Sequence, residues 1–206
     1  MRELWSVVHA ERAALIHDLR AVDRDRWATP SLCTGWDIHD VLAHLVDDAK
    51  TTRTGFVRRL IIAGFDFDRA NNLGIMRERT DDPARTLAAF EAVRLRTTGA
   101  PAPAATRLVE AIVHGEDIRR PLDIHRAYPA EAVIEALQFQ ARTSVTIGGG
   151  RERLKGLRLH STDASFDVGS GQKVYGPAIA LLLAVSGRPV RPGELTGPGA
   201  MALMVA

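Results

Sequence analysis

The sequence has few of the residues that mark several common classes of protein. Its 206 residues include a single cysteine, Cys33, and three lysines, and only 5% of them are aromatic. One cysteine excludes an intramolecular disulfide and a cysteine-rich metal site, and it favours a reducing compartment. A net charge of +2 with so few aromatics argues against the basic, aromatic-lined groove typical of nucleic-acid binding.

Long hydrophobic runs are also missing. The longest apolar run covers residues 178–185, far below the roughly 20 residues that span a bilayer. The chain opens with Met1-Arg2-Glu3 and lacks the apolar stretch of a secretory signal. Its 46% hydrophobic and 25% charged residues are ordinary for a globular protein. We therefore expect a cytoplasmic protein, monomer or homodimer, that binds neither membrane nor nucleic acid.

The spacing of apolar residues predicts a mainly helical chain. Apolar residues recur at helical intervals in five segments, at 2–21, 36–63, 83–93, 104–120 and 130–146. Thr34 is the expected N-cap of the second helix. The periodicity is lost between residues 64 and 82, where we expect a long loop or a broken helix that borders the functional site.

The pattern changes near residue 150. The triple glycine at 148–150 is expected to be a hinge. Alternating apolar residues after it predict strands at 157–160 and 166–168, and residues 178–185 predict a helix that Gly187 caps. We therefore expect a helical domain over residues 1–150 and a small α+β region over residues 151–206.

Histidines beside carboxylates are the candidate metal ligands. Glu110 and His114 are four residues apart, so they share one face of a helix, and His44 lies on another predicted helix. Two imidazoles and one carboxylate suit zinc, and also Fe(II), Ni(II) or Co(II). Three protein ligands leave room for water or substrate. Asp117 and Asp40 are candidates to orient the imidazole N–H groups.

Spacing alone does not bring these three residues together. A glutamate four residues before a histidine is a common pattern, and a solvated ion pair with an unrelated surface histidine explains it more simply. The tryptophans Trp5, Trp27 and Trp36 are most simply core anchors. Cys33 is most simply a small buried residue.

Three blocks of sequence match the pattern of a known family. The first is Trp27…Ser31-x-Cys33-x-Gly35-Trp36-Asp-Ile-x-Asp40-Val-Leu-Ala-His44-Leu. The second is Arg107-Leu-Val-Glu110-Ala-Ile-Val-His114-Gly-Glu-Asp117-Ile-Arg-Arg-Pro121. The third runs from Leu157 to Gly197 and includes Gly187-Arg188-Pro189. Together they resemble the mycothiol-dependent maleylpyruvate isomerase family, part of the wider DinB-like metal-binding helical bundles.

The resemblance implies a fold, a metal and a thiol. The fold is a mainly α, DinB-like four-helix bundle with a small α+β C-terminal region. A divalent metal, zinc foremost, is held by His44, Glu110 and His114, and mycothiol is the thiol cosubstrate. The implied activity is that of an isomerase or thiol transferase acting on a small electrophilic substrate, with Arg188 as the candidate catalytic residue that binds a substrate carboxylate.

A second class of function stays open at this point. A metal-binding helical bundle without thiol chemistry would act as a small-molecule sensor or binding protein. Metal analysis and thermal stability with mycothiol distinguish the two classes, because only the enzyme requires a thiol at the metal.

Overall fold

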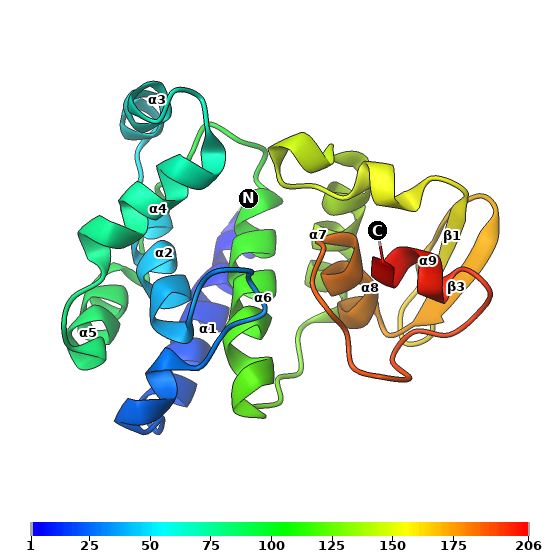
Figure 1. Cartoon of the computed structure of the whole chain (residues 1–206), viewed down its shortest axis with the longest axis horizontal. Helices are drawn as coiled ribbons and strands as arrows, with labels where there is room; N and C mark the ends of the chain where they lie inside the picture. Colours follow the sequence, from blue (N-terminus) through cyan, green and yellow to red (C-terminus); the bar gives the residue numbers. More distant parts are fainter. Residues whose placement is uncertain (1, 206) are drawn as a thin grey trace. The chain divides into compact units, whose positions relative to one another are not determined.

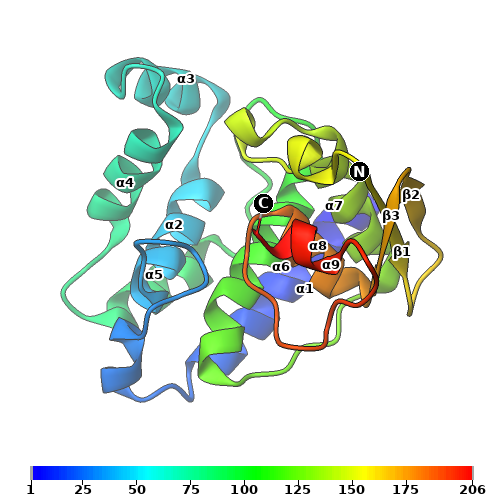
Figure 2. The same cartoon turned by 45° about the vertical axis from the view of Figure 1, so that its right-hand side comes forward.

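The computed structural model describes residues 2–205, and the chain divides into two compact units, residues 1–126 and 127–206. Helices of the first unit are labelled in Figure 1 and Figure 2. They are α1 (Arg2–Leu19), α2 (Ile38–Lys50), α3 (Arg53–Ile62), α4 (Phe67–Glu78), α5 (Pro83–Val93) and α6 (Thr106–Arg119).

Four of these helices form the expected four-helix bundle. Helix α1 packs against α5 and α6, and helix α2 packs against the same two helices. The apolar faces meet in a core whose fully buried members include Ile38, Leu42 and Phe90. Burial of such side chains is worth about 1.5–3 kcal/mol each, so this core fixes the relative placement of α2 and α6.

Helix α2 begins later than the sequence suggests, because its cap is Asp37 and not Thr34. The Asp37 carboxylate accepts from the backbone N–H of Asp40 at 2.7 Å, and the Asp40 carboxylate accepts from the backbone N–H of Asp37 at 3.1 Å. This reciprocal pair is a capping box. It also sets the start of the helix, and hence the face on which His44 lies.

The expected long helix over residues 36–63 is two helices. Helix α2 ends at Lys50, and Thr51 turns the chain with an extended backbone. The hydroxyl of Thr52 then caps α3 by accepting from the N–H of Gly55. Thr51 and Thr52 are both β-branched, and the hydroxyl of Thr52 bonds to the backbone in a way that competes with continuation of the helix. This explains the break between α2 and α3.

The segment expected to be a long loop or a broken helix, residues 64–82, contains helix α4. Asp66 caps it by accepting from the N–H of Arg69. The helix lacks a strong apolar stripe because it packs on α2 through small residues, Ala70 and Gly74, together with Ile75. Small residues give little hydrophobic periodicity, so the pattern does not reveal the helix.

Gly74 lies directly against a buried carboxylate of α2. A Cβ at this position would lie 2.5 Å from Oδ2 of Asp47. Asp47 is almost completely buried and accepts from Arg59 of α3 and Arg77 of α4. The carboxylate therefore has little freedom to move away, and it links three helices.

We predict that Gly74→Ala lowers the free energy of unfolding by about 1 kcal/mol. Overpacking costs about 1–3 kcal/mol, and the better helix propensity of alanine returns up to about 1 kcal/mol. Denaturant unfolding measures the change. Asn71→Ala, on the same helix, serves as the control and should not destabilise the protein. Stabilisation by Gly74→Ala would contradict the packing described here.

The second unit is the small α+β region, with α7 added to it. It contains helices α7 (Ala130–Arg142), α8 (Ala178–Val185) and α9 (Ala200–Val205) and strands β1 (Leu157–Ser161), β2 (Asp167–Gly169) and β3 (Gln172–Gly176). The strands, labelled in Figure 2, lie in the order β2-β1-β3, with β1 antiparallel to β2 and parallel to β3. Helix α8 is almost entirely buried and packs on α7, α9 and β1.

The triple glycine lies inside this second unit, whereas the sequence suggested a boundary there. A Cβ on Gly149 would lie 2.1 Å from the carbonyl oxygen of Thr143, and one on Gly150 would lie 2.0 Å from that of Val185. Glycine is therefore needed for close packing of the backbone. Helix α7 stays with α8, and the division of the chain comes before α7.

Among residues 2–205, no helix combines the length and the apolar character that crossing a bilayer requires.

Candidate metal centre

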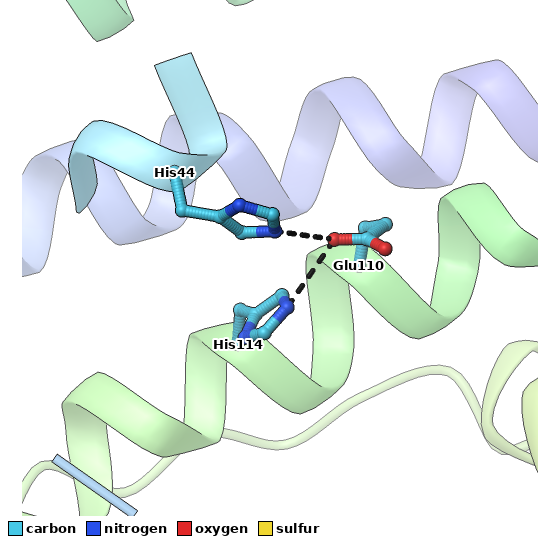
Figure 3. Close-up of side chains that lie close together, drawn as sticks. All are labelled: His44, Glu110 and His114. Carbon is cyan, nitrogen blue, oxygen red and sulfur yellow. Dashed lines mark hydrogen bonds and ion pairs between the residues drawn. The ribbon is translucent and has the colours of Figure 1, made fainter. Parts of the chain in front are cut away.

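Helices α2 and α6 bring His44, Glu110 and His114 together in the first unit. Figure 3 shows both imidazoles directed at one carboxylate. Nε2 of His44 lies 3.2 Å and Nε2 of His114 lies 3.3 Å from Oε2 of Glu110. The possible ligand atoms of the three residues all lie within 4.8 Å of one another. The packing of α2 on α6 supplies the contact that spacing alone did not predict.

The three side chains are largely withdrawn from water. His44 is 7% exposed as a residue, and the side chains of His114 and Glu110 are 12% and 29% exposed. A solvated pair with an unrelated surface histidine is therefore not what the structure contains. Of the three side chains, that of Glu110 keeps the largest exposed fraction.

Asp117 holds the ring of His114 from the far side. Its Oδ2 lies 2.8 Å from Nδ1 of His114, and its side chain is completely buried. Accepting from Nδ1 assigns the proton to that nitrogen and leaves Nε2 as the ligand atom, the arrangement usual for metal-binding histidines. This contact fits the role expected for Asp117 from the sequence.

Asp40, the other residue expected to orient an imidazole, has a different role. Its carboxylate closes the capping box of α2 and accepts from Nη1 of Arg79 at 2.7 Å. Although Asp40 precedes His44 by one helical turn, its side chain is held at the start of the helix by these contacts. It therefore stabilises α2 and does not orient the His44 ring.

The carboxylate and the imidazoles shift each other's pKa values. Burial raises the pKa of Glu110, but the hydrogen bonds and the charges of His114 and His44 together outweigh burial and hold it well below its usual range. Burial lowers the pKa of His114, but hydrogen bonds to Asp117 and Glu110 outweigh it and raise the pKa to about 9. Glu110 therefore remains an anion, and a metal ion bound at Nε2 of His114 would displace the proton that these contacts favour.

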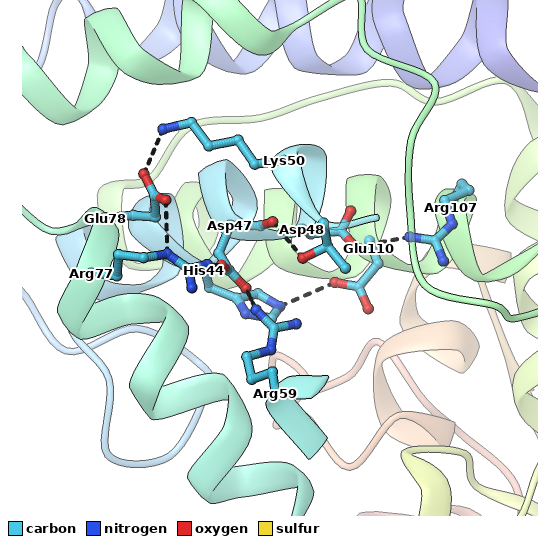
Figure 4. A network of polar contacts seen from close by, with 10 residues as sticks. His44, Asp47, Asp48, Lys50, Arg59, Arg77, Glu78, Arg107 and Glu110 are labelled. Atoms are coloured by element: carbon cyan, nitrogen blue, oxygen red, sulfur yellow. Dashed lines mark hydrogen bonds and ion pairs between the residues drawn. The ribbon is translucent and has the colours of Figure 1, made fainter. Parts of the chain in front are cut away.

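A second ion cluster lies one helical turn away, as Figure 4 shows. Asp48 of α2 accepts from Nη1 of Arg107 at 2.8 Å and lies 3.8 Å from Nη2 of Arg12. Burial, followed by the charge of Glu110, raises the pKa of Asp48. The two arginines stabilise a carboxylate that would otherwise be unfavourable so close to Glu110.

Trp36 is the residue at this site that the sequence analysis missed. Its ring centroid lies 5.1 Å from that of His44 and 6.3 Å from that of His114. Trp27, by contrast, is buried in the core as expected. The sequence signal for Trp36 was its position directly after Gly35 and two residues before the helix that bears His44.

The donor set fits a divalent metal ion. Two imidazole nitrogens and one carboxylate oxygen converge from two helices, and each is a good ligand for zinc. Three protein ligands are typical of a catalytic site, in which a further position accepts water or substrate. Asp117 supplies the outer contact that such sites usually contain.

Arg188, the candidate catalytic residue, belongs to the second unit. It follows α8, after Gly187, whose φ of +75° ends the helix. Nη1 of Arg188 donates to the carbonyl oxygen of Ser186 at 2.9 Å. Its role in binding a carboxylate stays a prediction.

Comparisons with known proteins agree with this site and fold. The family model of the mycothiol maleylpyruvate isomerase N-terminal domain matches residues 8–119, more than half of the chain and a range that contains the three candidate ligands. A search of curated proteins found no match.

Two solved structures match nearly the whole chain. They are the mycothiol-dependent maleylpyruvate isomerase and a mutant of it. Each matches with a TM-score of 0.62 at 17% sequence identity, and each match covers 97% of this chain and 93% of the chain in the solved structure. At this identity the match establishes the expected fold, a mainly helical DinB-like structure with a small C-terminal sheet. Membership of an enzyme family agrees with the expectation of an enzyme. The chain belongs to the mycothiol maleylpyruvate isomerase N-terminal domain family.

Proposed function

We propose that this protein is a mycothiol-dependent isomerase or thiol transferase that works with a divalent metal, foremost zinc. The observation that carries the proposal is the convergence of His44, Glu110 and His114 on one point between α2 and α6. The side chain of Glu110 is 29% exposed, and the proposal requires that thiol and substrate reach the cluster from this side. That the thiol is mycothiol is inferred from membership of the family.

Each residue of the site has a defined part in the proposal. His44, Glu110 and His114 would hold the ion, and Asp117 fixes the proton of His114 on Nδ1. A bound divalent cation lowers the pKa of a coordinated thiol, so that the thiolate forms at neutral pH. The carboxylate of Glu110 keeps the donor set anionic, and the low exposure of the imidazoles strengthens electrostatic interactions within the site.

The thiol comes from outside the chain. The sequence holds a single cysteine, and Cys33 is not among the residues that form the cluster of possible ligands. In an isomerisation, the external thiolate adds to an electrophilic carbon, the resulting single bond rotates, and the same thiolate is then eliminated. Retention of the adduct is thiol transfer. Isomerisation returns the thiol unchanged, so mycothiol is then needed only in catalytic amounts.

Arg188 is proposed to bind a carboxylate of the substrate. A guanidinium binds a carboxylate through two parallel hydrogen bonds, and lysine does not reproduce that geometry. If the proposal holds, Arg188→Lys should raise KM for a carboxylate substrate while leaving metal content unchanged. Unaltered kinetics in Arg188→Lys would assign the residue to the surface of the second unit.

The proposed function is tested by incubating the zinc-loaded protein with maleylpyruvate, with and without mycothiol, and following both geometric isomers by NMR. We expect conversion only when thiol and metal are both present, with no net consumption of thiol. Accumulation of a thiol adduct would indicate transfer. Metal and thiol binding without turnover of maleylpyruvate or related electrophiles would favour the sensor or binding protein.

A further inference from the structure

The two histidines of the centre are held in different ways. His114 has its Nδ1 bonded to the buried carboxylate of Asp117. Nδ1 of His44 is buried as well, but it has no hydrogen-bond partner among the residues that the structure describes. Metal-binding histidines almost always donate their second ring N–H to a partner that fixes the ring. Nε2 of His44 faces Glu110 at 3.2 Å, but within residues 2–205 no hydrogen bond at Nδ1 fixes the other side of the ring.

The contacts of the His44 ring are aromatic. The indole of Trp36 lies 5.1 Å from it at an angle of 42°, and the ring of His114 lies 4.8 Å from it at 72°. Both are within the range of favourable aromatic pairs. Trp36 also lies 6.3 Å from His114, so one indole contacts both imidazoles of the centre.

Trp36 is itself held firmly. Its indole Nε1–H donates to Oδ1 of Asn72 on α4 at 3.0 Å. Its backbone N–H donates to the carbonyl oxygen of Cys33, and its carbonyl oxygen accepts from both the N–H and the hydroxyl of Ser31. Gly35 adopts a φ of +83°, which allows the turn directly before Trp36. The ring is thus fixed at one edge by α4 and at its backbone by the turn.

We propose that Trp36 is a positioning residue of the metal centre, and that Asn72 acts through it. The indole orients the ring of His44, as the carboxylate of Asp117 orients the ring of His114. It limits rotation of the ring and keeps Nε2 directed at Glu110. The inference rests on the proposed function, because it concerns how the protein holds the metal.

Titration with Co²⁺ tests the role, since its visible absorption reports both binding and coordination geometry. Trp36→Leu should weaken Co²⁺ binding about tenfold, the lower end of the usual loss on removing an orienting partner. Asn72→Leu should weaken it by less. Both variants should shift the absorption band, and Asn72→Asp, which keeps an acceptor for the indole N–H, should restore its position. A merely structural role would lower thermal stability and leave the band unchanged.

Matched variants serve as controls. Asn71→Leu alters the neighbouring position of α4, and Trp27→Phe alters a tryptophan that packs on His39 at 5.8 Å, so neither should affect the Co²⁺ band. An unchanged dissociation constant and band in folded Trp36→Leu would overturn the inference. If that variant does not fold, an unchanged band in Asn72→Leu overturns it. Failure of the parent protein to bind Co²⁺ would refute the metal centre as a whole.

Discussion

Mycothiol is expected to raise the melting temperature of the zinc-loaded protein by about 5–10 °C at 100 times its dissociation constant, because such saturation adds about 2.7 kcal/mol of stability. Glutathione should stabilise it much less. Both compounds offer a thiol to the ion, but selectivity needs contacts to the sugar portion that glutathione lacks. Thermal unfolding followed by circular dichroism measures the shift.

Stabilisation by mycothiol should disappear in His44→Ala, because the thiolate then loses the cation that stabilises it. His125→Ala is the matched control, since His125 lies near the end of the first unit, outside the cluster of ligands, and should respond like the parent. An equal shift in chelator-treated protein would show that the thiol binds independently of the metal. No shift with any thiol in protein confirmed to hold zinc would favour the sensor or binding protein.

Replacing Asp117 is expected to weaken zinc binding about 10- to 100-fold. Asp117→Asn should lie at the lower end of this range, because the amide oxygen can still accept from Nδ1 of His114 but without charge. Asp117→Ala should lie at the upper end, because it removes the acceptor and leaves a void beside a buried ring. Competition for zinc with a chromophoric chelator measures both constants.

Asp40→Asn is the control for this series. By sequence, both aspartates were candidates to orient a metal-binding histidine. In the structure, Asp40 caps α2 and pairs with Arg79. Its replacement should therefore lower the free energy of unfolding without changing zinc affinity. Equal loss of affinity in Asp40→Asn and Asp117→Asn would contradict the different roles given to the two residues.

The candidate site was only partly predictable from local sequence. Glu110 and His114 share a helix face by their spacing, and Asp117 continues that face, as the structure has it. The contact of these residues with His44 depends on the packing of α2 against α6, and helical periodicity does not encode which helices become neighbours. His44 was a candidate because carboxylates flank it, but only the resemblance to a family placed it with Glu110 and His114.

The fold was predictable where apolar periodicity is strong. Helix α5 begins and ends at the expected residues. Helix α8 does so as well, because its uninterrupted apolar run ends at a glycine cap. For residues 64–82 a loop and a broken helix stayed open as alternatives, because Ala70 and Gly74 of α4 bury little apolar surface. The start of α4 was nevertheless marked by Asp66, because aspartate is a good N-cap residue.

Trp36 shows a different limit of sequence analysis. An aromatic residue in a turn is ordinarily a core anchor, and Trp36 does pack at the edge of the bundle core. Its contacts with His44 and Asn72 join a turn, α2 and α4, which are separate in sequence. Such a contact becomes visible only when the three-dimensional arrangement is known.

The central claim is tested most directly by elemental analysis of protein purified without chelator and then reloaded with zinc. The account predicts about one equivalent of metal per chain, nearly none in His44→Ala and His114→Ala, and full occupancy in His125→Ala. The absence of stoichiometric metal from the reloaded parent protein, or full occupancy in both ligand variants, would contradict it.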